Sequence, residues 1–135
     1  MNVDYCLTRN FYHKLLPSIR SLVEHNPNVK IYILAEDDEI PDLPVKATII
    51  NISDEHQFDH SVNIGNRFGG YINLLKVFYP KYFPRINKII QLDVDTIICD
   101  SLAPLWKTNL TNKWIAAVPE YQARHSQLNL YGDTY

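Results

Sequence analysis

The sequence has little of the features that mark several common protein classes. Its two cysteines, Cys6 and Cys99, are too few for a disulfide framework, and both lie in apolar runs, so we expect small core side chains there. The 13 basic and 15 acidic residues give a net charge of −2, and no cluster of lysine and arginine stands out. We therefore expect no nucleic-acid partner and no binding to an anionic membrane through bulk charge.

Long apolar segments are also missing from the sequence. No apolar run approaches the ~20 residues that are needed to cross a bilayer. Residues 1–4 lack the basic and hydrophobic regions of a signal peptide. We therefore expect no membrane span and a cytoplasmic location.

The composition that remains is that of an ordinary globular protein. Hydrophobic residues make up 46% of the chain and charged residues 21%, which separates it from disordered sequences. A length of 135 residues is typical of one domain, and neither a repeat nor a linker divides it. We predict a single domain over residues 1–135.

The first half of the chain predicts alternating strands and helices. Residues 3–7, 30–34 and 48–52 are short β-rich apolar runs. Between the first two runs, five apolar residues recur at helical spacing. They are Leu15, Leu16, Ile19, Leu22 and Val23. This pattern predicts a helix that begins near Lys14, has Pro17 in its first turn and ends at residues 26–28.

The second half predicts another helix and two strands. A second apolar stripe predicts a helix that Pro80 and Pro84 close. Its members are Tyr71, Leu74, Leu75, Phe78 and Tyr79. Residues 88–92 predict a strand with a short apolar continuation, residues 114–118 predict a last strand, and the two tryptophans are expected as core or interface anchors. The order β-α-β-β-α-β with apolar strands indicates an α/β fold, in which ligands collect at the carboxyl ends of a largely parallel sheet.

An acidic pair, Asp93 and Asp95, directly follows the apolar strand at residues 88–92. In an extended chain, residues i and i+2 project to the same side, so both carboxylates are expected to point one way. Their mutual repulsion is relieved by a divalent cation, and ligation by oxygen alone suits Mg²⁺ or Mn²⁺. The same pair also fits surface acids in a turn, or N-caps of the segment that follows.

Two enzyme classes place such a pair at a strand end. In haloacid-dehalogenase-type phosphatases the first Asp is a nucleophile within D-x-D-x-T, but here Thr96 comes one residue early and Ile97 takes the threonine position. In nucleotide-sugar glycosyltransferases of the GT-A type, the pair holds a metal that bridges the donor diphosphate.

Four segments and the gaps between them resemble a known family: residues 75–84, 86–88, 92–95 and 102–106. They are similar to the basic residue, the LPelFP-like segment, the LDxD strand end and the dLxpLW tail of glycosyltransferase family 8. This family includes glycogenin, bacterial lipopolysaccharide galactosyl- and glucosyltransferases, and plant galacturonosyltransferases. Residues 7–12 also resemble the end of the family's first strand.

The resemblance implies a Rossmann-like GT-A fold, with a mostly parallel sheet flanked by helices, and a UDP-sugar donor. It implies donor contacts from Leu7, Thr8, Asn10 and Tyr12, in which the turn after the strand touches the uridine and Tyr12 lines the base. Judged as residue types alone, Thr8 and Asn10 can hydrogen-bond a base or ribose, but they fit a turn or N-caps of the next helix better.

The resemblance also implies a metal site and a reaction. Asp93 and Asp95 would hold Mn²⁺ or Mg²⁺ against the diphosphate, and Asp93 would also touch the ribose. Lys76 matches the family's basic residue and would neutralise the diphosphate or pair with Asp93, although its place off the apolar stripe also fits a solvated helix face. The implied reaction is a retaining, metal-dependent transfer of a hexosyl or pentosyl group from the UDP-sugar to a glycan or other hydroxyl acceptor.

The chain departs from the family beyond residue 135. Family members continue with an FNSGV-like strand, an acceptor-binding half and a late histidine that completes the metal site. We therefore expect residues 1–135 to be the nucleotide-sugar-binding half of a truncated GT-A domain, inactive alone. An exposed sheet edge beyond Val118 would favour a homodimer. The alternatives are a non-catalytic module that binds nucleotide or metal, and a phosphohydrolase with Asp93 as nucleophile.

Overall fold

The computed structural model describes residues 1–36, 40, 42–54 and 78–118. Its strands and helices alternate along the first half of the chain and become short in the second half. The strands are β1 (Asn2–Leu7), β2 (Lys30–Ala35), β3 (Ala47–Asn51) and β4 (Ile90–Leu92). The helices are the 3-10 turn η1 (Arg9–Phe11), α1 (Tyr12–His25), α2 (Tyr79–Tyr82) and α3 (Ala103–Trp106).

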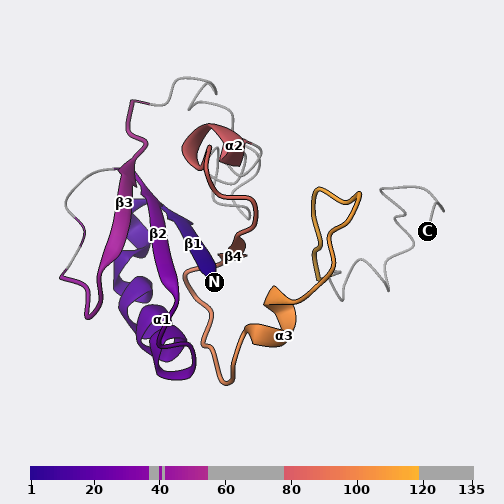
Figure 1. Cartoon of the computed structure of the whole chain (residues 1–135). Coiled ribbons are helices and arrows are strands. Elements are labelled where there is room, and N and C mark those ends of the chain that lie inside the picture. The colour runs from indigo at the N-terminus through magenta and orange to yellow at the C-terminus, as the bar shows by residue number, and fades with distance from the viewer. Residues whose placement is uncertain (37–39, 41, 55–77, 119–135) are drawn as a thin grey trace, which may run out of the picture.

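The four strands form one parallel sheet in the order β3-β2-β1-β4, so β1 and β2 are central. Helices α1 and α2 lie on opposite sides of this sheet (Figure 1). Two separate clusters of buried side chains match these two sides, one between the sheet and α1 and a smaller one around Leu34, Ile52 and Phe83. The prediction of an α/β fold with a parallel sheet flanked by helices is confirmed.

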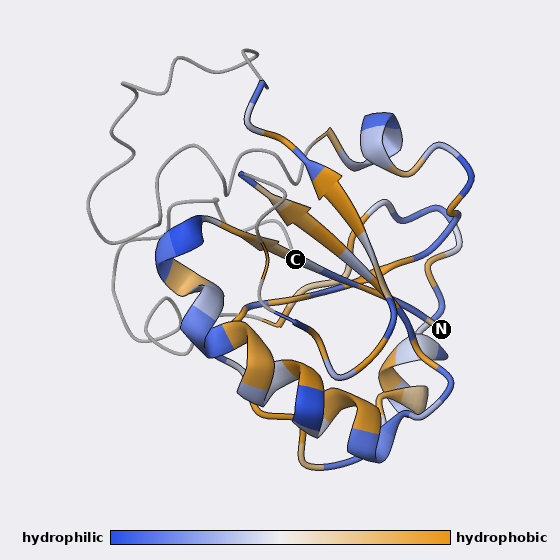
Figure 2. Cartoon of the chain, turned by 90° about the vertical axis from the view of Figure 1, so that its left-hand side faces the viewer, coloured by the Kyte–Doolittle hydropathy of each residue, from blue (hydrophilic) through white to orange (hydrophobic). Residues whose placement is uncertain are grey.

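Helix α1 packs on the sheet through its apolar stripe. Leu15, Ile19 and Leu22 are completely buried, and hydrophobic and hydrophilic residues alternate along the helix in Figure 2. The helix begins at Tyr12, not near Lys14, because the buried Tyr12 extends the stripe by one more turn.

Pro17 is consequently the sixth residue of α1, and its predicted place in the first turn is wrong. A proline there has no N–H to donate to the carbonyl one turn earlier. The predicted stop is confirmed, because the Asn26 N–H caps α1 by donating to the Leu22 carbonyl at 2.9 Å.

The predicted strands at residues 3–7, 30–34, 48–52 and 88–92 are confirmed within two residues at each end. The predicted strand at residues 114–118 is wrong. The chain there is irregular, with Trp114 97% and Val118 90% exposed. A strand forms only against a partner strand, and in the described part of the chain no strand pairs with this segment.

Pro80 and the two cysteines differ in part from the expectations. Pro80 lies in the first turn of α2, where a proline's missing N–H leaves no helical bond unmade, and the helix that contains it continues to Tyr82. The helix predicted upstream of it lies outside the described residues. Cys6 is half-buried, whereas Cys99 is exposed, so Cys99 is not a core side chain.

The two tryptophans differ in their packing. Trp106 packs against the core on the α1 side of the sheet, as predicted, and Trp114 does not. Among the residues that the structure describes, no helix combines the length and the apolar character needed to cross a bilayer.

Candidate functional site

The carboxyl ends of β1 and β4 bring two polar segments to one edge of the sheet. These strands are neighbours and parallel, with Tyr5 paired to Leu92. The segment that starts at Thr8 and the segment that starts at Asp93 therefore leave the sheet side by side. Thr8 and Asp95 therefore lie at the same edge of the sheet, the carboxyl edge at which ligands of α/β proteins collect.

The acidic pair lies in a turn directly after β4. The Thr96 N–H donates to the Asp93 carbonyl at 3.2 Å, and the Thr96 hydroxyl donates to the same oxygen at 2.6 Å. Val94 is buried in the core between the two acids, while Asp93 and Asp95 are exposed. Both carboxylates are therefore accessible, and the turn fixes the backbone between them.

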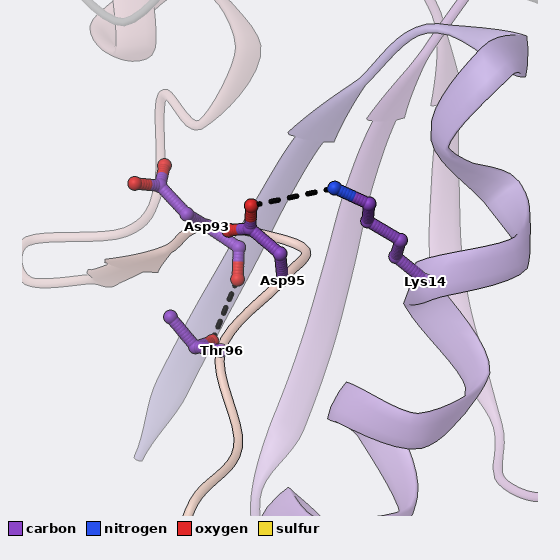
Figure 3. Close-up of polar contacts among 4 residues, drawn as sticks. All are labelled: Lys14, Asp93, Asp95 and Thr96. Atoms are coloured by element: carbon purple, nitrogen blue, oxygen red, sulfur yellow. Dashed lines mark hydrogen bonds and ion pairs between the residues drawn. The ribbon is translucent and has the colours of Figure 1, made fainter.

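The extended geometry that the sequence suggested for this pair is wrong. Because the chain turns at residues 93–96, the two side chains do not point one way. Figure 3 shows the Asp95 carboxylate facing Lys14 of α1, whereas the Asp93 side chain points away from α1. Asp93 accepts a hydrogen bond from Gln91 Nε2 at 3.2 Å.

Lys14 forms an ion pair with Asp95 that the sequence analysis did not find. Its Nζ lies 3.5 Å from Asp95 Oδ2, and the two side chains are 38% and 60% exposed. The same Nζ lies 5.2 Å from the centre of the Phe11 ring. An open groove of about 370 Å³ runs between α1 and the turn. Its lining includes His13, Lys14, Pro17, Asp95 and Thr96.

A chain of hydroxyl groups connects the turn to the interior. The single proton of the Thr96 hydroxyl is used on the Asp93 carbonyl, so at the Ser18 Oγ to Thr96 Oγ1 contact of 3.4 Å the donor is Ser18. Tyr5 in turn donates to Ser18 at 3.0 Å. Burial raises the pKa of Tyr5 further above its ordinary value, so this phenol is a protonated donor at neutral pH and also at more alkaline pH. The hydrogen bonds therefore run from Tyr5 to Ser18, from Ser18 to Thr96, and from Thr96 to the Asp93 carbonyl in the acidic turn.

The segment after the turn is also fixed to α1 by polar contacts. The Ile98 N–H donates to Ser21 Oγ at 2.9 Å, and the Leu102 N–H donates to Asn26 Oδ1 at 2.9 Å. Together with Ser18, these α1 side chains hold residues 96–102 along one side of the helix. The position of the acidic turn therefore depends on α1 as well as on β4.

The four candidate donor-binding residues at the end of β1 separate into two pairs. Leu7 and Tyr12 are buried in the core. Thr8 is half-buried and Asn10 is exposed at the carboxyl edge of the sheet. Thr8 precedes η1 but its side chain makes no capping hydrogen bond, so the alternative role as a side-chain N-cap is not seen. Lys76 lies outside the described residues.

A buried carboxylate lies on the other face of β1. Asp4 is completely buried, and the Tyr79 hydroxyl donates to its Oδ2. Burial raises the pKa of Tyr79 far above its ordinary value, and the charge of Asp4 raises it further. Asp93 makes a smaller contribution to the same shift. This contact joins α2 to the central strand, and the only signal for it in the sequence is a charged residue inside an apolar strand.

The acidic pair fits a hard divalent cation in the type of its donor atoms. Both carboxylates are exposed at the ligand-binding edge, and an ammonium group already lies beside Asp95. Within the described ranges, no group of three or more His, Cys, Asp or Glu side chains gathers as a metal site. If a divalent cation bound here, Asp93 and Asp95 would supply only part of a six-coordinate shell.

A family model and two plant proteins match the sequence of this chain. The model of the family described as glycosyl transferase family 8 matches residues 2–131. The probable galacturonosyltransferase-like 9 of Arabidopsis thaliana is 30% identical over 94 residues, which cover 70% of this chain and 20% of that protein. The probable galacturonosyltransferase 13 of the same plant is 32% identical over 71 residues, 50% of this chain and 13% of that protein.

Two solved structures share the fold. An active-site mutant of LgtC matches with a TM-score of 0.70 at 18% identity, over 94% of this chain and 49% of that chain. The galactosyltransferase LgtC in complex with donor and acceptor sugar analogs matches with a TM-score of 0.60. The chain thus has the GT-A fold and spans about half the length of these structures. Since the family model matches nearly the whole chain, this protein belongs to glycosyltransferase family 8.

Proposed function

We propose that this chain is the donor-binding part of a retaining, metal-dependent glycosyltransferase that uses a UDP-sugar. The observation that carries the proposal is the acidic turn at Asp93–Asp95, which lies beside Thr8 at the carboxyl edge of the sheet in a chain of family 8. The match to LgtC, whose structure holds donor and acceptor sugar analogs, supports a sugar donor and a sugar acceptor.

The residues of this chain would bind and orient the donor. Thr8 and Asn10 offer hydrogen-bonding groups for the nucleoside next to the acidic turn. Asp93 and Asp95 would hold Mn²⁺ or Mg²⁺, and Lys76 would add a positive point charge for the diphosphate. When bound, the divalent cation acts as a Lewis acid that takes up charge on the departing nucleotide diphosphate. The transferred hexosyl or pentosyl group would pass to a hydroxyl of a glycan or related acceptor.

A second candidate function is a module that binds nucleotide and metal without catalysis. In the part of the chain that the structure describes, no group of three or more metal-ligating side chains gathers around the acidic turn, which fits a binding module as well as a transferase. The family match argues against the phosphohydrolase with Asp93 as nucleophile. Both remaining candidates require the same metal-assisted binding of nucleotide, so binding is the first property to test.

Calorimetry of UDP binding tests this requirement. We expect UDP to bind at least tenfold more tightly with Mn²⁺ than with EDTA, because the cation links the diphosphate to the carboxylates. Asp95→Asn should abolish the difference between Mn²⁺ and EDTA. Asp54→Asn is the matched control, since Asp54 is an exposed acid outside the acidic turn. Equal UDP affinity with EDTA and with Mn²⁺ in the unmodified chain would contradict the proposal.

A further inference from the structure

We propose that Lys14 is a built-in competitor of the divalent cation for Asp95 and so sets the affinity of the metal site. This inference rests on the proposed function, because it assumes that Asp95 is a metal ligand. It assigns a role to a residue that lies on α1, far from the acidic turn in the sequence.

The geometry places the lysine ammonium where a second cation would have to bind. Lys14 Nζ lies 3.5 Å from Asp95 Oδ2 and faces it across the groove between α1 and the turn (Figure 3). The Phe11 ring lies 5.2 Å from the same Nζ and favours a cation at this position. The Asp95 carboxylate and the Phe11 ring thus both attract the Lys14 ammonium and hold it in this position.

A metal ion and the Lys14 ammonium cannot share Asp95 without repulsion. A divalent cation bound to Oδ2 would lie within a few ångströms of Nζ, where like charges repel appreciably even in water. Lys14 must therefore move away, and the ion pair is lost when the metal binds. Because Lys14 is 38% exposed and borders an open groove, it has room to make this movement.

The partial exposure of the pair limits the size of the effect. Ion pairs at such surfaces are weak, so the competition lowers metal affinity by a modest factor. Adding the residual repulsion that the displaced ammonium still exerts across the groove, we expect Lys14 to weaken Mn²⁺ binding roughly three- to tenfold. Removal of Lys14 should therefore tighten metal binding, an outcome that simple damage to the fold does not produce.

The experiment measures Mn²⁺ affinity from the electron paramagnetic resonance signal of free Mn²⁺ at low ionic strength. The proteins are the unmodified chain, Lys14→Met, Lys14→Arg, Arg20→Met and Asp95→Asn. Arg20→Met is the matched control, because it removes one exposed positive charge from the same helix. We expect three- to tenfold tighter binding in Lys14→Met and less than a twofold change in Lys14→Arg and in Arg20→Met.

The remaining outcomes separate this inference from the proposed function. If the unmodified chain binds Mn²⁺, Asp95→Asn loses it, and Lys14→Met binds no more tightly than Arg20→Met, the competitor role is wrong and the metal site stands. If neither the unmodified chain nor Lys14→Met binds Mn²⁺, the metal site is wrong and this inference falls with it.

Discussion

The segment from β1 to β2 and the segment after β4 are held in place by different forces. In the first, Leu15, Ile19 and Ile33 are completely excluded from solvent. In the second, Ile97 is 61% exposed and Trp114 97% exposed, and the described part of the segment, residues 93–118, is irregular apart from α3. Burial of apolar side chains stabilises the first segment throughout. In the second, Val94 and Ile98 also reach the core, and hydrogen bonds to Ser21 and Asn26 help to position the chain that follows the turn.

This difference separates a scaffold from a site. The acidic turn belongs to the second segment, yet the groups that orient it, Ser18 and Ser21, belong to the first. Polar contacts can fix a loop while leaving its carboxylates open to a ligand, which a fully buried segment cannot do. The comparison predicts that substitutions in the first segment cause large losses in the free energy of unfolding. Substitutions in the second segment should cause progressively smaller losses toward the end of the described chain.

The largest expected effect is in the core beneath α1. Leu15→Ala or Ile19→Ala removes a completely buried side chain and leaves a cavity, so we expect a loss of about 2–5 kcal/mol in the free energy of unfolding. Urea denaturation followed by circular dichroism measures it. The control is Arg20→Ala on the exposed side of the helix, and an equal loss in this control would contradict the assignment of the buried face.

The next effect concerns the contact between α2 and β1. Tyr79→Phe removes the hydroxyl that donates to the buried Asp4 carboxylate, at an expected cost of about 2–3 kcal/mol. The same denaturation series tests it, with Tyr32→Phe as a control for the loss of an aromatic hydroxyl. A Tyr79→Phe chain as stable as the unmodified one would show that Asp4 does not depend on this donor.

Tyr79 also predicts how stability changes at alkaline pH. The pKa of Tyr79 is raised in the folded chain, so above pH 10, the ordinary pKa of a tyrosine, the unfolded chain loses this proton while the folded chain keeps it. Stability should then fall by up to about 1.4 kcal/mol per pH unit for this group, and be unaffected by it below that pH. Urea denaturation between pH 9 and 11 should show a shallower decline in Tyr79→Phe, and identical slopes would be the contrary result.

A smaller effect is expected where the two segments meet. Ser18→Ala breaks the hydroxyl chain from Tyr5 to Thr96, so we expect a loss of about 1–2 kcal/mol. If Asp93 and Asp95 bind Mn²⁺, the loosened turn should also weaken that binding severalfold. The exposed Ser53→Ala serves as the control, and unchanged stability together with unchanged Mn²⁺ affinity would show that the hydroxyl chain does not position the turn.

The sequence predicted the scaffold because its signals are local. The spacing of Leu15, Ile19 and Leu22 predicts α1, and the apolar strands place Asp93 at a strand end. The turn at residues 93–96 agrees with the alternative of surface acids in a turn, whereas the contacts of Lys14 and Ser18 were missed. Their partners are distant in the sequence, as with Ser18 and Thr96, 78 residues apart, and a polar residue on an amphipathic helix carries no sign of what it contacts.

The failed strand at residues 114–118 leads to the smallest expected effect. An apolar run predicts burial only if the fold provides a surface to pack against, and Trp114 is 97% exposed. Trp114→Ser should therefore change the free energy of unfolding by less than about 0.5 kcal/mol, as is usual for surface positions. Trp106→Ser is the matched comparison, and it should lower the free energy of unfolding by more. Trp106 packs against the core, and the centre of its ring lies 5.4 Å from Lys88 Nζ. Equal losses in the two variants, measured by urea denaturation, would mean that residues 114–118 are packed in solution and that the contrast between the two segments is smaller than the structure indicates.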